Sequence, residues 1–79
     1  MQAIRIAYCG TCNYRPIAAR LGYSIRKECG IEPLLEHSAQ MGAFEVYADS
    51  ALVFSKLQSG RFPDEDEIIS ALKARQAGA

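Results

Sequence analysis

The fold is decided by residues 3–30, whose sequence is AIRIAYCGTCNYRPIAARLGYSIRKECG. In residues 3–8 the large apolar side chains of Ile4, Ile6 and Tyr8 alternate with Ala3, Arg5 and Ala7. This period of two predicts a strand with one buried face. Residues 13–29 carry apolar side chains at a spacing of four, which predicts a helix. The sequence between them is Cys-Gly-Thr-Cys, residues 9–12, so a Cys-x-x-Cys pair stands at a junction between a strand and a helix.

The predicted first helix has a buried stripe and definite limits. The stripe consists of Ile17, Leu21, Ile25 and Cys29, with Ala18 beside it. Pro16 fits the first turn of a helix, where its missing N–H is not needed. Gly30 supplies the stop, because glycine readily adopts the left-handed conformation that ends many helices.

Three further strands are predicted after this helix. Residues 31–38 form the first of them, and Pro33 indicates that it is an edge strand or that the proline marks its start. The helical connection before it is long enough for a parallel return. Residues 44–48 and 52–57 predict a hairpin around the polar turn of residues 49–50.

Residues 65–76 predict a last helix. Asp64 and Glu67 fit an acidic form of the capping box at its start. Acidic residues gather near its beginning and basic ones near its end, which suits the helix dipole. Its inner face is expected to hold Ile68, Ile69, Leu72 and either Arg75 or Gln76.

The predicted element order is β-α-β-β-β-α, which is an α/β fold. Arg5 and Glu45 lie opposite the apolar faces of their strands. The four strands are expected to form one mixed sheet. Because a strand covered by helices on both faces is apolar throughout, the two charges predict that both helices lie on one face of this sheet. A chain of 79 residues has room for one core, so we expect a single domain over residues 1–79.

The composition argues against several functional classes. Nine basic and nine acidic residues give zero formal net charge, which argues against a nucleic-acid-binding surface or a polybasic membrane surface. No apolar run approaches the roughly 20 residues of a membrane-spanning helix, and the first residues do not resemble a signal peptide. Three cysteines do not make the even-numbered framework of a small secreted protein. We therefore expect a cytoplasmic protein that binds neither nucleic acid nor membrane.

The cysteine pair permits thiol–disulfide exchange. This reaction needs a thiolate, an accessible sulfur and a second thiol that resolves the mixed disulfide. A helix start supplies unpaired N–H groups that lower the pKa of a thiol, and we expect Cys12 to lie there. Arg15 is expected to add positive charge, and Tyr14 to shield or present the pair. Spacing alone does not decide whether Cys9 or Cys12 attacks.

Two other classes of protein use a similar pair. Zinc needs four ligands, and beyond the pair only Cys29, on the buried stripe, and His37, in a polar stretch, remain. Copper-binding modules carry Cys-x-x-Cys between a strand and a helix because soft thiolates select Cu(I), but their pattern has a Met-x-Cys-x-x-Cys start and a β-α-β-β-α-β order. We expect no resident metal. A copper- or zinc-binding module and a non-catalytic interaction domain remain as alternatives.

Four segments resemble the signatures of the selenoprotein W-like (Rdx) family. Residues 8–16, YCGTCNYRP, resemble its Y-C-G-x-(Cys or selenocysteine)-x-Y-x-P motif. Residues 42–46, GAFEV, resemble its G-x-F-E-V strand, and residues 52–56, LVFSK, resemble its L-(I/V)-(F/H)-S-K strand. Residues 60–63, GRFP, are similar to the G-x-(F/Y)-P loop before the last helix. The match covers nearly the whole chain, in order.

The resemblance implies a thioredoxin-like fold and a thiol–disulfide oxidoreductase or redox-responsive protein. It also implies glutathione as a candidate reductant or partner. We expect no resident cofactor, and a protein thiol or disulfide as a further partner. Selenocysteine-containing members carry that residue at the position of Cys12. The resemblance therefore implies that Cys12 is the attacking sulfur and Cys9 the resolving one.

Two departures from thioredoxin itself bear on substrate binding. The proline that faces the active site there is absent, and Met41 and Gly42 occupy that region; Gly42 is expected to permit a close approach of the backbone to the sulfurs. The middle helix is absent too, which fits the open sheet face. That face is expected to bind a partner protein or a second copy of the chain. The candidate substrate-binding residues are Tyr14, Arg15 and Gly42.

Overall fold

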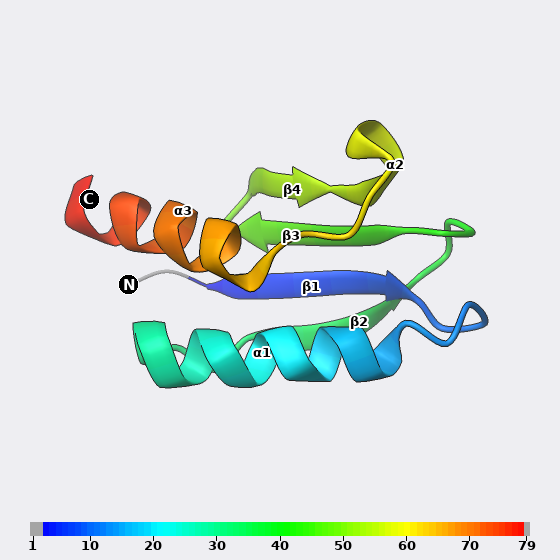
Figure 1. Cartoon of the computed structure of the whole chain (residues 1–79), viewed down its shortest axis with the longest axis horizontal. Helices are drawn as coiled ribbons and strands as arrows, with labels where there is room; N and C mark the ends of the chain where they lie inside the picture. The colour runs from blue at the N-terminus through cyan, green and yellow to red at the C-terminus, as the bar shows by residue number, and fades with distance from the viewer. Residues whose placement is uncertain (1–2, 79) are drawn as a thin grey trace.

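The computed structural model describes residues 3–78. Its elements are β1 (Ile4–Cys9), α1 (Arg15–Cys29), β2 (Leu34–Ser38), β3 (Phe44–Ala48), β4 (Ala51–Ser55), α2 (Lys56–Ser59) and α3 (Glu65–Gly78). The strands form one mixed sheet in the order β2-β1-β3-β4 (Figure 1). β1 pairs in parallel with β2 and antiparallel with β3, and β3 pairs antiparallel with β4. The predicted four-stranded mixed sheet is confirmed.

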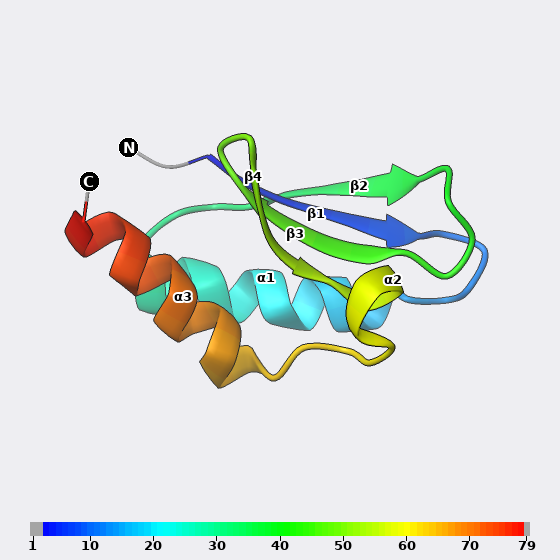
Figure 2. The same ribbon diagram turned by 90° about the horizontal axis from the view of Figure 1, so that it is seen from above.

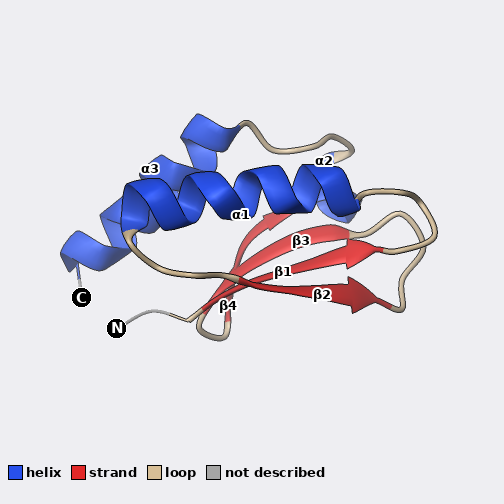
Figure 3. Cartoon of the chain, turned by 90° about the horizontal axis from the view of Figure 1, so that it is seen from below, coloured by secondary structure: helices blue, strands red, loops and turns tan. Residues whose placement is uncertain are grey.

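Both long helices lie on one face of the sheet (Figures 2 and 3). α1 packs against β1 and β2, and α3 packs against β4 and α1. The largest fully buried side chains lie in the layer between sheet and helices: Ile6, Ile25, Phe44, Val46, Ile68 and Leu72. Removing these apolar side chains from water is the main source of the stability of the fold.

The opposite face of the sheet is uncovered at Arg5, as its position in the sequence predicts. Arg5 Nε lies 3.0 Å from Glu36 Oε1 on β2, and its guanidinium lies 4.3 Å from the centre of the Tyr47 ring on β3. These contacts run across three neighbouring strands. Because the charged groups are well exposed, we expect them to contribute little to the stability of the fold.

Glu45 differs from the expectation, because only 8% of its surface is exposed. The hydroxyl of Ser55 donates a hydrogen bond to Glu45 Oε1 at 2.7 Å and accepts one from the N–H of Gln58 at 3.2 Å. Ser55 is thereby the N-cap of α2, a short helix that the sequence pattern does not predict and that packs against β3. Glu45 is therefore buried where β4 runs into α2, although it lies on the face opposite the long helices.

The limits of α1 are partly as predicted. Gly30 has a φ of 72° and its N–H donates to the carbonyl of Arg26 at 3.0 Å, so the predicted stop is confirmed. The start is later than expected, because Asn13 has a φ of 61° and the helix begins at Arg15. Pro16 lies in the first turn, as predicted. Ile17 is 38% exposed, and Ala18 takes the buried position instead.

The remaining elements are shorter or longer than predicted by a few residues. β2 begins only after Pro33, and β4 ends at Ser55 because α2 follows at once. At the start of α3 the Glu67 carboxylate accepts a hydrogen bond from the N–H of Asp64 at 3.1 Å, which is one half of the predicted capping box. Gln76, expected on the inner face, is exposed and donates to the carbonyl of Cys29 at 3.2 Å. Arg75 is exposed too.

No helix within residues 3–78 is both long enough and apolar enough to span a bilayer.

Candidate redox site

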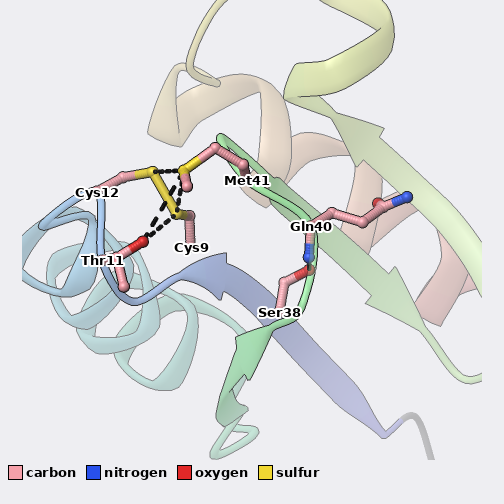
Figure 4. The surroundings of a disulfide bond; sticks show 6 residues. All are labelled: Cys9, Thr11, Cys12, Ser38, Gln40 and Met41. Atoms are coloured by element: carbon pink, nitrogen blue, oxygen red, sulfur yellow. Dashed lines mark hydrogen bonds between the residues drawn. A yellow bond between two sulfur atoms is a disulfide. The ribbon is translucent and has the colours of Figure 1, made fainter.

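Cys9 and Cys12 are joined by a disulfide, with their Cα atoms 5.4 Å apart (Figure 4). Cys9 is the last residue of β1, and its N–H donates to the carbonyl of Ala43 at 2.8 Å, which ties it to the start of β3. Cys9 is only 2% exposed, whereas Cys12 is half-buried. The two sulfurs are therefore inequivalent, and Cys12 is the one that solvent reaches more readily.

The turn that carries Cys12 precedes the helix and is not part of it. The N–H of Asn13 lies 3.4 Å from the carbonyl of Gly10, which closes the turn. α1 begins three residues after Cys12, so the expectation that Cys12 opens the helix is wrong. Because the influence of a helix dipole falls off within about one turn, the N-terminus of α1 acts more weakly on the Cys12 thiol than the sequence suggests.

The side chain of Met41 lies over the disulfide (Figure 4). Its Sδ lies 3.6 Å from Cys12 Sγ, 3.8 Å from Cys9 Sγ and 3.9 Å from the hydroxyl oxygen of Thr11. The Thr11 hydroxyl also lies 3.5 Å from Cys9 Sγ. Met41 is 75% exposed, so the disulfide is covered by one flexible side chain that a substrate can displace.

A hollow of about 410 Å³ opens beside the disulfide. Polar and apolar side chains line it together, from Cys9, Gly10, Thr11, His37, Ser38, Ala39, Gln40 and Met41. The His37 ring packs so closely on Gly10 that a Cβ there would lie 3.3 Å from three ring atoms. The same ring meets Tyr8 edge-on, with ring centres 5.2 Å apart. Glycine at position 10 is therefore favoured by the close approach of the imidazole, which would have to shift to make room for a Cβ.

The three candidate substrate-binding residues lie in different surroundings. Tyr14 packs edge-on against Phe62, with ring centres 4.7 Å apart, so its ring is part of an aromatic cluster. Arg15 is exposed at the start of α1. Gly42 has a φ of 79°, and the space that a Cβ would occupy is empty. Glycine is thus favoured there by the backbone angle and not by a close approach to the sulfurs.

The third cysteine is separated from the pair by the length of α1, which at 15 residues is roughly 22 Å. Burial raises the pKa of the Cys29 thiol above its ordinary value; Lys73 opposes the shift and Glu28 adds to it. A raised pKa leaves less thiolate at neutral pH, so Cys29 is a poor nucleophile. This agrees with its predicted place on the buried side of the helix.

Met41, His37 and Thr11 are the neighbours of the disulfide that sequence reasoning did not assign to the site. His37 stands in a polar stretch of the sequence and is exposed, but its ring lies against the cysteine turn. A signal existed in the strand order. Because β1 runs parallel to β2 and antiparallel to β3, residues after β2 and before β3 meet the end of β1.

A four-stranded mixed sheet with its helices on one face and a Cys-x-x-Cys disulfide at the end of the first strand is the arrangement of a thioredoxin-like fold. The chain belongs to the Rdx family, whose family model matches residues 3–74. The resemblance inferred from the four sequence segments is thereby confirmed.

Similar proteins agree with this assignment. A selenoprotein W-related protein from Vibrio cholerae superposes with a TM-score of 0.83 at 24% identity, covering 92% of this chain and 94% of that one. A Bordetella parapertussis protein superposes with a TM-score of 0.84 at 18% identity, covering 94% and 96%. Both likenesses show the fold. Migration and invasion enhancer 1 of Bos taurus and of Mus musculus are each 33% identical over 76 residues, or 95% of this chain. The chain spans 65% of the length of these relatives.

Proposed function

We propose that the protein is a thiol–disulfide oxidoreductase whose redox centre is the Cys9–Cys12 pair. The observation that carries this proposal is the disulfide, which joins the end of β1 to a turn beside an open hollow. Membership of the Rdx family supports it. The pair also has one shielded and one reachable sulfur, which suits the separate attacking and resolving steps of exchange.

In this proposal Cys12 attacks and Cys9 resolves. The Cys12 thiolate attacks one sulfur of a substrate disulfide, forms a mixed disulfide and expels the other substrate sulfur as a thiol. The Cys9 thiolate then attacks Cys12 Sγ, releases the second substrate thiol and leaves the Cys9–Cys12 disulfide. Two electrons and two protons pass from the pair to the substrate. Two glutathione molecules reset the pair by the reverse exchanges and become glutathione disulfide.

The polar groups within the hollow support a small peptide thiol or an extended peptide as the substrate class. Thr11 and Ser38 offer hydroxyl groups, Gln40 offers an amide and His37 an imidazole, all in the lining of the hollow that opens beside the disulfide. Such groups pair with the amide and carboxylate groups of glutathione. In this proposal Gly42 sets the backbone that carries Met41, and exposed Arg15 adds positive charge near the turn.

An assay of glutathione-dependent reduction tests the proposal. The substrate is a glutathionylated peptide, and formation of glutathione disulfide is followed through glutathione reductase and NADPH. We expect the protein to accelerate the reaction and Cys12→Ser to lower the rate to that of glutathione alone. Cys29→Ser is the matched control and retains the activity, because Cys29 lies at the far end of α1. Equal rates for wild type and Cys12→Ser would contradict the proposal.

A further inference from the structure

Three sulfur atoms meet at the redox turn, those of Cys9, Cys12 and Met41 (Figure 4). The thioether of Met41 lies 3.6 Å from Cys12 Sγ and 3.8 Å from Cys9 Sγ. Backbone geometry directs Met41 to this place. The N–H of Ala43 lies 3.3 Å from the carbonyl of Gln40, and Gly42 between them has a positive φ. A methionine that is 75% exposed thus has its sulfur against two cysteine sulfurs.

We propose that the reduced Cys9–Cys12 pair and Met41 form a three-coordinate binding site for Cu(I). Soft thiolate and thioether ligands select monovalent copper. Three ligands around one ion, with metal–sulfur bonds of roughly 2.3 Å, stand roughly 4 Å from one another. Both distances from Met41 to the cysteine sulfurs are already close to that value. Reduction of the disulfide lets the two cysteine sulfurs separate to the same spacing.

Binding leaves copper in the Cu(I) oxidation state. Two molecules of a thiol reductant such as glutathione first convert the disulfide to two thiols and become one disulfide. Cu(I) then forms bonds to the two cysteine sulfurs and to the Met41 thioether, and the two thiol protons pass to solvent. The resulting site carries one net negative charge. Metal affinity therefore rises with pH, because each thiol must lose its proton before it binds.

Zinc is disfavoured by the same ligand set. A structural zinc ion takes four ligands from cysteine, histidine and carboxylate side chains. Within residues 3–78, no group of three or more such side chains is arranged to hold a metal ion. The third sulfur here is a thioether, which suits Cu(I) and not zinc. Met41 is 75% exposed and Cys12 is half-buried, so an incoming chelate can reach two of the three ligands from solvent.

The copper site shares one requirement with the proposed function, namely that the Cys9–Cys12 disulfide can be reduced. Copper bound by both thiolates blocks exchange, so loading with one equivalent of Cu(I) is expected to stop the oxidoreductase reaction. If the pair never turned over a disulfide substrate, the sulfur cluster would still bind copper after chemical reduction.

Competition with bicinchoninate, a chelator selective for Cu(I), tests the site under anaerobic conditions. All variants carry Cys29→Ser, so that only the pair supplies thiolates. Met41→Leu keeps the size and apolar character of the side chain and removes only the thioether ligand. We expect Met41→Leu to bind Cu(I) about tenfold more weakly or worse, and X-ray absorption at the copper edge to count three sulfur neighbours in the parent and two in the variant.

Two results would overturn the proposal. One is that Met41→Leu binds Cu(I) as tightly as the parent and that X-ray absorption counts only two sulfur neighbours of copper in the parent. Copper would then be bound by the two cysteines alone. The other is binding of zinc to the reduced parent as strongly as Cu(I). Neither result bears on the glutathione-dependent assay of oxidoreductase activity. Conversely, if the protein were inactive in that assay but bound copper through three sulfurs, only the proposed oxidoreductase function would be refuted.

Discussion

Cys9→Ser is expected to accumulate mixed disulfides with its substrates, and Cys12→Ser is not. Cys12 is half-buried in an open turn, so a substrate disulfide can reach it, whereas Cys9 is 2% exposed at the end of β1. Without Cys9 nothing inside the protein resolves the mixed disulfide on Cys12, and the intermediate persists. Quenching cells with acid, alkylating free thiols and analysing the purified variants by mass spectrometry without reductant measures the adducts.

Cys29→Ser serves as background for both variants, so that any adduct lies on one remaining cysteine of the pair. The expected outcome is that a large fraction of the Cys9→Ser protein carries glutathione or a protein adduct, against traces in Cys12→Ser. Adducts that collect on Cys9 in the Cys12→Ser variant would reverse the assigned roles, and burial would then not decide which sulfur attacks.

Phe44→Ala is expected to have the largest effect on folding. Phe44 is fully buried at the start of β3, and its ring meets Phe62 edge-on with centres 5.5 Å apart. Removing a buried phenylalanine costs about 3 to 5 kcal/mol in protein cores. A chain of 79 residues has a total stability of about 4 to 12 kcal/mol, so this change removes much of it. Urea denaturation followed by circular dichroism measures the loss.

Two further variants make the measurement specific. Phe44→Leu keeps an apolar side chain in the same place, and we expect it to lose less stability than Phe44→Ala. Tyr23→Ala removes an aromatic ring that is 56% exposed on α1, so its effect is expected within about 0.5 kcal/mol. An equal loss in the free energy of unfolding in Phe44→Ala and Tyr23→Ala would contradict the placement of Phe44 in the core.

Local pattern was sufficient to predict the sheet and the long helices. Phe44, Val46 and Ala48 alternate with other residues, and β3 has the predicted bounds of residues 44–48. The stop of α1 at Gly30 was readable because one residue type favours the required backbone angle. Arg5 indicated the uncovered face, because a charge on a strand shows which side faces solvent.

What the sequence did not reveal depends on contacts between distant segments. Asn13 and Tyr14 fall within the span predicted as helix, but the turn that brings the two sulfurs together puts Asn13 in a left-handed conformation. Asparagine tolerates that conformation better than most residues, and this was the available signal. Glu45 is buried by Ser55 and the turn of α2, which no periodicity within β3 can report.

The position of Met41 also depends on contacts between distant segments. It follows from the pairing of β3 with β1, which sets the residues before Phe44 beside the end of β1. Proximity of that loop to the cysteines was inferred from the thioredoxin comparison, but the contact of three sulfurs depends on a side-chain position.

Equilibration with glutathione buffers of graded redox poise tests the central claim most directly, namely that Cys9 and Cys12 form a reversible dithiol–disulfide couple. Acid quenching, alkylation and mass spectrometry of the Cys29→Ser protein count its free thiols at each poise. We predict a single two-electron transition between two thiols and none, with a midpoint in the range of about −270 to −120 mV. A protein that keeps both thiols, or forms only glutathione adducts and never the Cys9–Cys12 disulfide, would contradict the claim.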